Sequence, residues 1–133
     1  MLILTALVFV FLMVAIVAAV ADLLVMIDAS ARARSAAYAG AVAGGQDVDP
    51  AEVSGPIADA GPPSAAAPGV CRQDAQLADP EATATCSVSG ALVTATVCQT
   101  VRYPVALLGL GGQVCDTEHA GAAFGTVRPG GGS

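Results

Sequence analysis

The amino-acid sequence predicts an α+β protein in which a long hydrophobic N-terminal helix is followed by a small disulfide-stapled head with a three-stranded antiparallel sheet. Three observations predict this fold. Of the first 27 residues, 25 are apolar, all four cysteines come after residue 70, and two stretches near the second cysteine alternate apolar and polar residues. Because 29 alanines and 15 glycines make up a third of the 133 residues, the head is expected to need its disulfides for stability.

The N-terminal segment Met1–Ala21 is long enough, at about 1.5 Å per residue, to cross the roughly 30 Å hydrocarbon core of a membrane. The alternative is a cleavable secretory signal released after Ala21, because small residues precede Asp22 at the spacing that signal peptidase requires. Such a signal carries basic residues ahead of a short apolar run, whereas no basic residue precedes Arg32 and the apolar run resumes at Leu23. A membrane-spanning segment is therefore favoured over cleavage.

The helix is expected to continue to Gly44, because the residues after the apolar segment contain no proline, are rich in alanine and end at a glycine pair typical of a C-terminal cap. Asp28 and Arg32 are four residues apart and can pair on one face. Small residues at three- and four-residue steps form a ridge along this helix, made of Ala29, Ala33, Ala37, Gly40 and Gly44. Such a ridge lets another helix approach closely. The alternative is that the ridge arises by chance, as it does in alanine-rich helices. If the ridge contacts another subunit, leucine at Gly40 or Ala33 should weaken association while the head stays folded.

Asp22 interrupts the apolar sequence of this helix. An ionised carboxylate costs roughly 2.5 to 3.5 kcal/mol at the centre of a bilayer and much less near its edge. We therefore expect Asp22 at the membrane interface or beside a cation supplied by a partner.

The segment after the helix changes character. Asp49–Glu52 has the order of an N-cap, a first-turn proline and an acidic residue, which predicts the start of one short helix. Gly61–Gly69 is a spacer of proline, alanine and glycine, and Arg72–Ala78 is expected to form a turn or two of helix. The expected division is residues 1–44 for the membrane and assembly helix, 45–70 for the short helix and spacer, 71–124 for the stapled head, and 125–133 for a flexible tail.

A hairpin is predicted where Ala84–Val88 and Ala91–Val97 alternate with a period of two around Ser89–Gly90. If Ser89–Gly90 is the two-residue turn, Cys86 faces Val93 and lies on the apolar face of the sheet. Cys98 then lies on the polar face, so the two cysteines should not bond to each other. A third strand is expected between residues 113 and 124.

The cysteines are expected to form disulfides and no metal site. Their spacings of 15, 12 and 17 residues contain no C-x-x-C pair, so zinc has little support even with His119 four residues after Cys115. Four cysteines permit three connectivities, of which the face argument favours Cys71 with Cys86 and Cys98 with Cys115. Each bond would close a loop of about 15 residues and contribute up to about 3 kcal/mol in the chain-entropy model.

Disulfides require an oxidising compartment, which places the head outside the cytoplasm. Arg32 and Arg34, which follow the apolar segment, favour the opposite orientation by the positive-inside rule. We give the cysteines more weight, because a leader preceding this numbering could carry the basic residues.

Charge and motifs exclude several classes of function. The chain has 5 basic and 11 acidic residues, a net charge of −6 and no lysine, so no nucleic acid is expected as a partner. The one histidine and the serines stand in no nucleophile or phosphate-loop pattern, so neither an enzyme nor a cofactor is expected. Glu118 and His119 are adjacent and would point to opposite faces of a strand.

The long apolar helix that continues into Ser30–Ala41, the hairpin, and the run of Val-x-Ala-x-Val, Tyr-Pro and Leu-Leu-Gly resemble the TadE-like pilins. These are small subunits of the tight-adherence (Flp) type IV pilus systems. The resemblance covers most of the chain. It implies insertion in the inner membrane, removal of a short leader by a prepilin peptidase, and polymerisation with other pilin subunits into an extracellular pilus at the cell surface.

The chain departs from this family at one position. Members usually carry glutamate at the fifth residue after cleavage, where it is thought to neutralise the N-terminal amine of a neighbour. If Met1 is the first residue, that position is Thr5. Asp22 cannot substitute, because seventeen residues of helix place it about 25 Å further along the axis. A subunit without that carboxylate could start or cap a filament, or could alternate with a second pilin that supplies the glutamate. We expect no homopolymer and a second pilin as partner; a secreted binding domain and a monomeric single-span protein are the alternatives.

Overall fold

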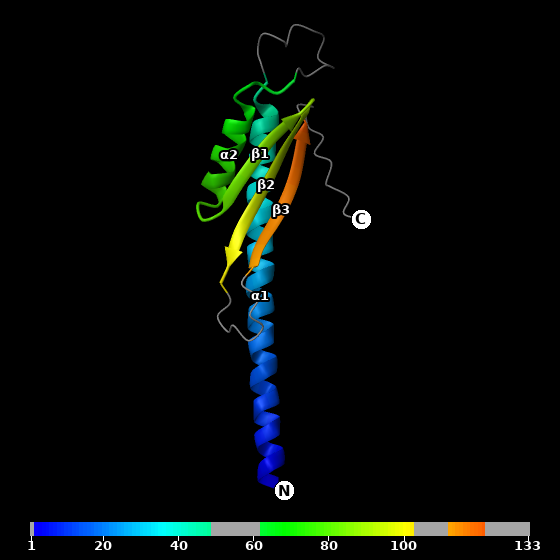
Figure 1. Cartoon of the computed structure of the whole chain (residues 1–133), viewed down its shortest axis with the longest axis vertical. Coiled ribbons are helices and arrows are strands. Elements are labelled where there is room, and N and C mark those ends of the chain that lie inside the picture. Colours follow the sequence, from blue (N-terminus) through cyan, green and yellow to red (C-terminus); the bar gives the residue numbers. More distant parts are fainter. Residues whose placement is uncertain (1, 49–61, 103–111, 122–133) are drawn as a thin grey trace.

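The computed structural model describes residues 2–48, 62–102 and 112–121 (Figure 1). It confirms the α+β class, with a long apolar helix, a three-stranded antiparallel sheet and two disulfides. The elements in chain order are α1 (Leu2–Gln46), α2 (Ala67–Ala78), β1 (Thr83–Ser89), β2 (Leu92–Val101) and β3 (Gly112–Gly121).

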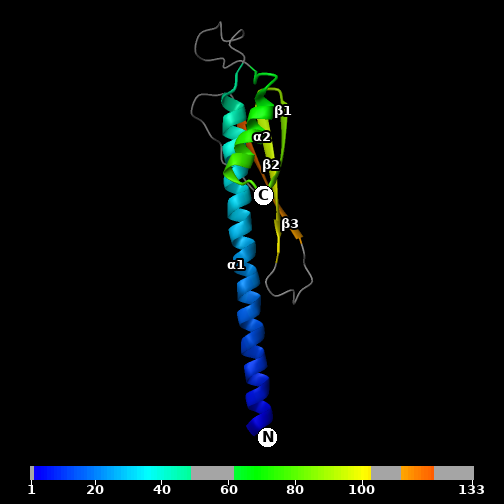
Figure 2. The ribbon, with the colours of Figure 1, turned by 90° about the vertical axis from the view of Figure 1, so that its left-hand side faces the viewer.

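Helix α1 has 45 residues and is about 67 Å long at the ordinary helical rise. Its N-terminal part stands alone, and its C-terminal part carries α2 and the sheet along one side (Figures 1 and 2). It ends at Gln46, two residues beyond the expected end at Gly44. Gly44 and Gly45 lie within the last turn because other elements pack against them: a Cβ on Gly45 would lie 3.3 Å from the Cβ of Ala120 on β3.

Helix α2 begins at Ala67 and has 12 residues, so the expected start at Arg72 was wrong and the last residues of the expected spacer are helical. Pro68 stands in the first turn, where its missing N–H leaves no bond unmade. The helix has three turns because one face is buried against α1, which compensates for a proline- and glycine-containing start.

The start of α2 is fastened to the end of α1. Ser64 donates from its backbone N–H to the Asp47 carbonyl at 2.7 Å and from its hydroxyl to Asp47 Oδ2 at 2.6 Å. The same hydroxyl accepts from the backbone N–H of Ala66. Val48 and Pro63 form an isolated antiparallel bridge beside these bonds. The short helix expected after Asp49 lies outside the described residues.

The sheet has the order β1-β2-β3, with both pairs antiparallel. Ser89 pairs with Leu92, so the turn is Gly90–Ala91 and not Ser89–Gly90. Gly90 has φ 60° and no non-glycine residue described has positive φ, the pattern of a type II′ hairpin turn. The true register differs from the expected one by two residues, which preserves the face of every side chain.

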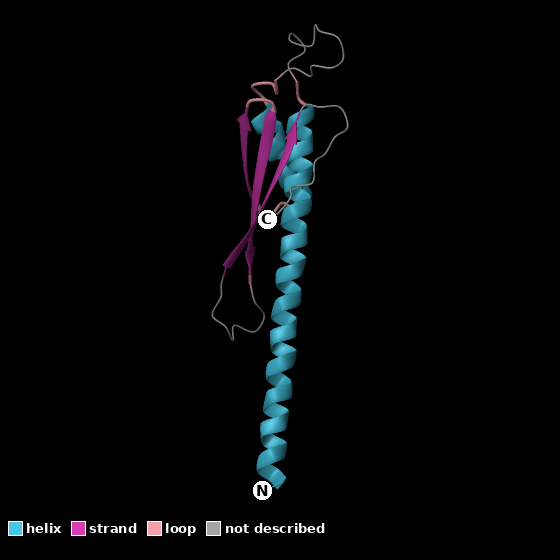
Figure 3. Cartoon of the chain, turned by 90° about the vertical axis from the view of Figure 1, so that its right-hand side faces the viewer, coloured by secondary structure: helices cyan, strands magenta, loops and turns pink. Residues whose placement is uncertain are grey.

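The head has two layers, with both helices against the inner face of the sheet (Figure 3). The core between them is made of small side chains, and the largest that are fully buried are Val93, Val97 and Cys71. The alanines on α1 that complete it include Ala33, Ala36, Ala37 and Ala41. A core of such small side chains buries little apolar surface, which explains why the head carries two disulfides.

A buried polar pair joins α2 to the central strand. Gln99 on β2 donates from Nε2 to Asp79 Oδ2, and both residues are more than 90% buried. Asp79 ends α2: its N–H donates to the Ala75 carbonyl, and its Oδ1 accepts from the N–H of Glu81. This pair was not predicted, although Gln99 falls on the apolar parity of β2, which indicates a buried polar group.

Candidate assembly surface

The N-terminal part of α1 is exposed on every side. We call Ile3–Val17 the stalk, because every side chain in it is exposed. Ile3 is 81% exposed, Phe11 76% and Val17 67%. A soluble monomer seldom exposes so continuous an apolar surface. The helix contains a segment long and apolar enough to cross a membrane, a property that signal sequences share.

Above the stalk, α1 has two different faces. One side is buried from Ala18 onwards, and at 100° per residue it lies opposite an exposed side. We call this exposed side the outward face; its members are Leu24, Ile27, Ala31, Ser35 and Tyr38. Leu24 is 61% exposed, Ile27 54% and Tyr38 45%. The apolar exposure of the stalk therefore continues along the open side of α1 as far as Ile27, and Tyr38 is exposed further along the same side.

The ridge of small residues lies on the buried side of α1. Ala33 and Ala37 are fully buried. A Cβ added to Gly40 would lie 2.7 Å from the Cys71 carbonyl oxygen on α2, and one added to Gly44 would lie 2.9 Å from both the Cys71 Cβ and a methyl of Val93 on β2. The ridge does admit a second helix, but that helix is α2 of the same chain.

The expectation that this ridge contacts another subunit, and that leucine there leaves the head folded, was therefore wrong. Helical spacing shows that a face is smooth, but it does not show which helix covers the face.

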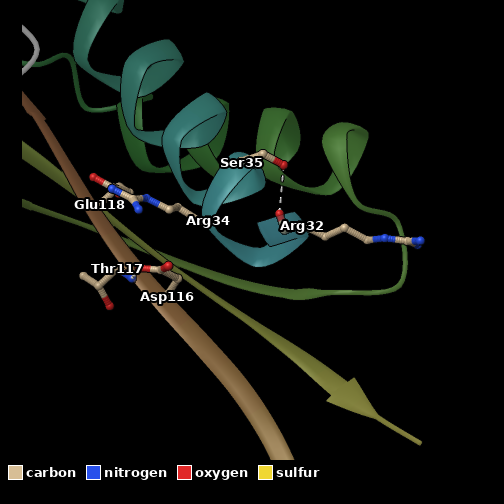
Figure 4. Close-up of polar contacts among 6 residues, drawn as sticks. All are labelled: Arg32, Arg34, Ser35, Asp116, Thr117 and Glu118. Atoms are coloured by element: carbon tan, nitrogen blue, oxygen red, sulfur yellow. Dashed lines mark hydrogen bonds and ion pairs between the residues drawn. The ribbon is translucent and has the colours of Figure 1, made fainter. Parts of the chain in front are cut away.

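Two arginines of α1 form ion pairs with different elements. Arg32 Nη2 lies 2.8 Å from Asp28 Oδ2, which confirms the expected pair; both side chains are 63% exposed, so the pair contributes only a few tenths of a kcal/mol. Arg34 Nε donates to Glu118 Oε1 on β3 at 3.2 Å. Figure 4 shows Arg34 directed at Glu118 and Arg32 directed to the opposite side, away from Glu118. Arg34 thereby ties the helix to the sheet.

The Arg34–Glu118 contact was not foreseen, although Glu118 has the inward parity of β3. Its neighbour His119 lies on the outer face, where Nδ1 is 2.9 Å from the Thr94 hydroxyl. Glu118 and His119 therefore point to opposite faces of the strand, as expected.

Asp22 is 7% exposed, and its Oδ1 is buried without a hydrogen-bond partner. It lies on the buried side of α1, not on the outward face. Its expected place at a membrane edge or beside a partner's cation stays a prediction. Thr5 lies in the stalk with its side chain exposed.

The disulfides are Cys71–Cys86 and Cys98–Cys115, which confirms the expected connectivity. The first joins α2 to β1 within the core, where Cys71 is fully buried. The second joins directly opposed residues of β2 and β3 on the outer face of the sheet. Among the residues that the structure describes, no group of three His, Cys, Asp or Glu side chains could hold a metal ion.

Mild reduction is expected to open Cys98–Cys115 before Cys71–Cys86. A thiolate must reach a sulfur atom, and Cys115 is exposed whereas Cys71 is fully buried. Timed treatment with a dithiol, followed by alkylation and peptide mass spectrometry, should label Cys98 and Cys115 first. Simultaneous labelling of all four cysteines would show that the head opens globally before either bond is reduced.

A scan against protein-family models and searches of curated proteins and of solved structures found no match to this chain.

Proposed function

We propose that this protein is a structural, pilin-like subunit of the TadE-like kind, which inserts in a membrane through α1 and then packs through the same helix into an extracellular fibre. The observation that carries the proposal is the exposed apolar surface that runs from Ile3 to Ile27, with Tyr38 exposed further along the outward face. A surface of this extent requires either lipid or protein around it.

The length of this surface favours a fibre over a monomeric membrane anchor. Large apolar side chains are exposed from Ile3 to Ile27, and these 25 residues extend about 37 Å as a helix. A hydrocarbon core of roughly 30 Å needs only about 20 residues. Tyr38 adds apolar exposure about 16 Å beyond Ile27, where a single-span anchor would meet water.

The disulfides favour a location of the head outside the cytoplasm, because both require an oxidising compartment. In such a subunit the head already lies outside the cytoplasm. Only the helix has to move, from the bilayer into contact with the helices of the fibre. The apolar surface then exchanges lipid for neighbouring helices without entering water.

We further propose that the neighbouring subunit is a second pilin. The stalk contains no carboxylate that could neutralise the N-terminal amine of a neighbouring subunit. Asp22 is also unsuited, since its carboxylate is buried within its own chain. The second pilin would supply the missing carboxylate.

The outward face is tested by the exposed substitution Ala31→Glu, with Gln73→Glu as its matched control. Both add one carboxylate to an exposed helical position, but Gln73 lies on α2, away from the outward face. We expect Ala31→Glu to lower incorporation into fibres at least about tenfold, the effect of 1.4 kcal/mol. Gln73→Glu should incorporate normally, and both heads should melt at the wild-type temperature. Equal incorporation of the two variants would contradict a role for the outward face.

Expression with the assembly machinery, with and without the second pilin, tests the rest of the proposal. We expect fibres that contain this chain only when the second pilin is present. Long fibres of this chain alone would refute the need for a second pilin. A mature N-terminus at Asp22 would instead identify a secreted protein, and a chain that stays in the membrane in both cases would identify a single-span anchor.

A further inference from the structure

The Cys98–Cys115 disulfide lies on the outer face of the sheet, the face turned away from the helix layer (Figure 3). Cys115 is exposed and Cys98 is half-buried. The two residues are directly opposed in the β2–β3 ladder with their Cα atoms 4.0 Å apart, so the S–S bond crosses from one strand to the other. A molecule in solution can reach this bond without any opening of the core.

Cleavage of this bond leaves the other contacts of the head in place. Strands β2 and β3 pair over all ten residues of each strand. Arg34 ties β3 to α1 through Glu118, and the Cys71–Cys86 disulfide ties α2 to β1. Because the core side chains lie on the other face of the sheet, cleavage exposes no buried apolar surface. Exchange at Cys98–Cys115 is therefore a local event.

The two sulfur atoms differ in the direction from which a thiolate can attack them. In thiol–disulfide exchange, the new bond forms on the side of the attacked sulfur opposite to the bond that breaks. Attack on Cys98 therefore comes from the side of β1, where Thr83 is the residue directly opposite Cys98. Attack on Cys115 comes over β3, an edge strand of the sheet. The described residues place no strand beyond this edge, so the approach to Cys115 is the open one.

The charge distribution of the head also favours the approach of a thiolate to this face. The chain as a whole has a net charge of −6, which repels anions. The side chains around the disulfide on the outer face are neutral; they are Thr83, Thr96, Thr100, Gln113 and Thr117. Asp116 follows Cys115 in the chain but has the inward parity of β3, and its Oδ1 accepts from the Thr117 N–H.

We propose that Cys98–Cys115 is a site of reversible thiol–disulfide exchange, at which the thiolate of a small thiol bonds to Cys115 and releases Cys98. The incoming sulfur donates an electron pair to Cys115 Sγ. The S–S bond breaks, and its electron pair stays on Cys98 Sγ, which takes a proton from water. One S–S bond replaces another, so no further oxidant or reductant is needed. Attack of the Cys98 thiolate on Cys115 reverses the step and expels the thiol.

The direction of attack favours a small thiol. The S–S bond crosses between strands, so the line of attack runs along the surface of the sheet and over its edge, where a thiol recessed in a folded protein would meet β3 first. The outer face of the sheet lies on the opposite side of the molecule from the outward face of α1. An attached thiol therefore leaves the proposed assembly surface free.

The test uses the full oxidised chain in detergent micelles, with reduced glutathione as the probe. Samples are quenched with acid early in the reaction, free thiols are alkylated, and the chain is digested with trypsin. Trypsin cuts after Arg102 and so separates Cys98 from Cys115. Mass spectrometry then measures the glutathione bound to each cysteine, and circular dichroism measures whether the head stays folded.

We expect the adduct on Cys115 to exceed that on Cys98 at least about tenfold, with Cys71–Cys86 intact and the head folded. Thr83→Ala clears the approach over β1 and should raise the share of Cys98 at least about threefold. Thr85→Ala is the matched control, because it shortens an exposed side chain of the same strand that lies opposite Thr96. It should leave the ratio of the two adducts unchanged.

Equal adducts on Cys98 and Cys115, or a larger adduct on Cys98, would overturn the proposal. So would an unchanged ratio in Thr83→Ala, or the absence of any adduct at glutathione concentrations that leave Cys71–Cys86 intact. None of these results would affect the proposed fibre, which depends on α1.

Discussion

Leucine in place of Gly40 is expected to prevent the head from folding, with a loss of about 3 kcal/mol or more in the free energy of unfolding. A Cβ at this position would already lie 2.7 Å from the Cys71 carbonyl oxygen and 2.9 Å from the Ala75 Cβ. The carbonyl belongs to the backbone of α2, and Cys71 is held by its disulfide to β1, so α2 cannot move aside without leaving the sheet. Denaturant unfolding, monitored by the near-ultraviolet signal of the disulfides, measures the loss.

The matched control is Ala31→Leu, which adds the same side chain to the exposed outward face of the same helix. Its effect on head stability should be within about 0.5 kcal/mol. If Gly40→Leu retained a folded head and lost only fibre assembly, the packing of α2 on the ridge would be refuted, and the ridge would again be a candidate contact between subunits.

Removal of the Cys71–Cys86 disulfide by alanine at both positions is expected to cost about 3 to 5 kcal/mol, more than removal of Cys98–Cys115. The two bonds span 15 and 17 residues, so the chain-entropy model assigns them nearly equal contributions. Cys71 is fully buried, however, and its sulfur fills space in a core with few larger side chains. Its loss adds a cavity cost to the entropic one.

Cys115 is exposed, so alanine at Cys98 and Cys115 leaves no cavity. We expect this variant to lose only about 2 to 3 kcal/mol, and thermal unfolding of the two double variants side by side measures the difference. Equal losses would show that the contribution of Cys71–Cys86 is purely entropic. A larger loss for the exposed bond would contradict the burial argument.

The disulfide pairing was predictable from the sequence even though the turn was misplaced. Side chains alternate with a period of two along a strand. Placing the turn at Ser89–Gly90 shifted the pairing register by two residues, which left Cys86 on the inner face and Cys98 on the outer. A register error of one residue would have placed both cysteines on the same face of the sheet. Parity is robust because it depends only on counting, whereas the turn depends on whether glycine stands first or second in it.

The start of α2, in contrast, could not be predicted from the sequence. Ala67–Val70 contains a proline and a glycine, and local propensity places these residues outside a helix. The burial of Ala67 and Cys71 against α1 and the bonds of Ser64 to Asp47 hold them in one. The free energy of tertiary packing exceeds helix-propensity differences of this size. Helix α1, against which α2 packs, is remote in sequence, so local sequence does not reveal the contact.

The α+β class, the long apolar helix, the strand faces and the cysteine pairs could be predicted from the amino-acid sequence, because periodicity and composition express them locally. Which side of α1 is covered could not be predicted, because it depends on how the layers pack. The ridge from Ala33 to Gly44 packs in the same chain, Arg34 reaches Glu118 and Asp79 meets Gln99, since contacts between remote residues depend on how the layers are stacked. The outward face follows from that stacking: it is the side of α1 that remains once the head has covered the other.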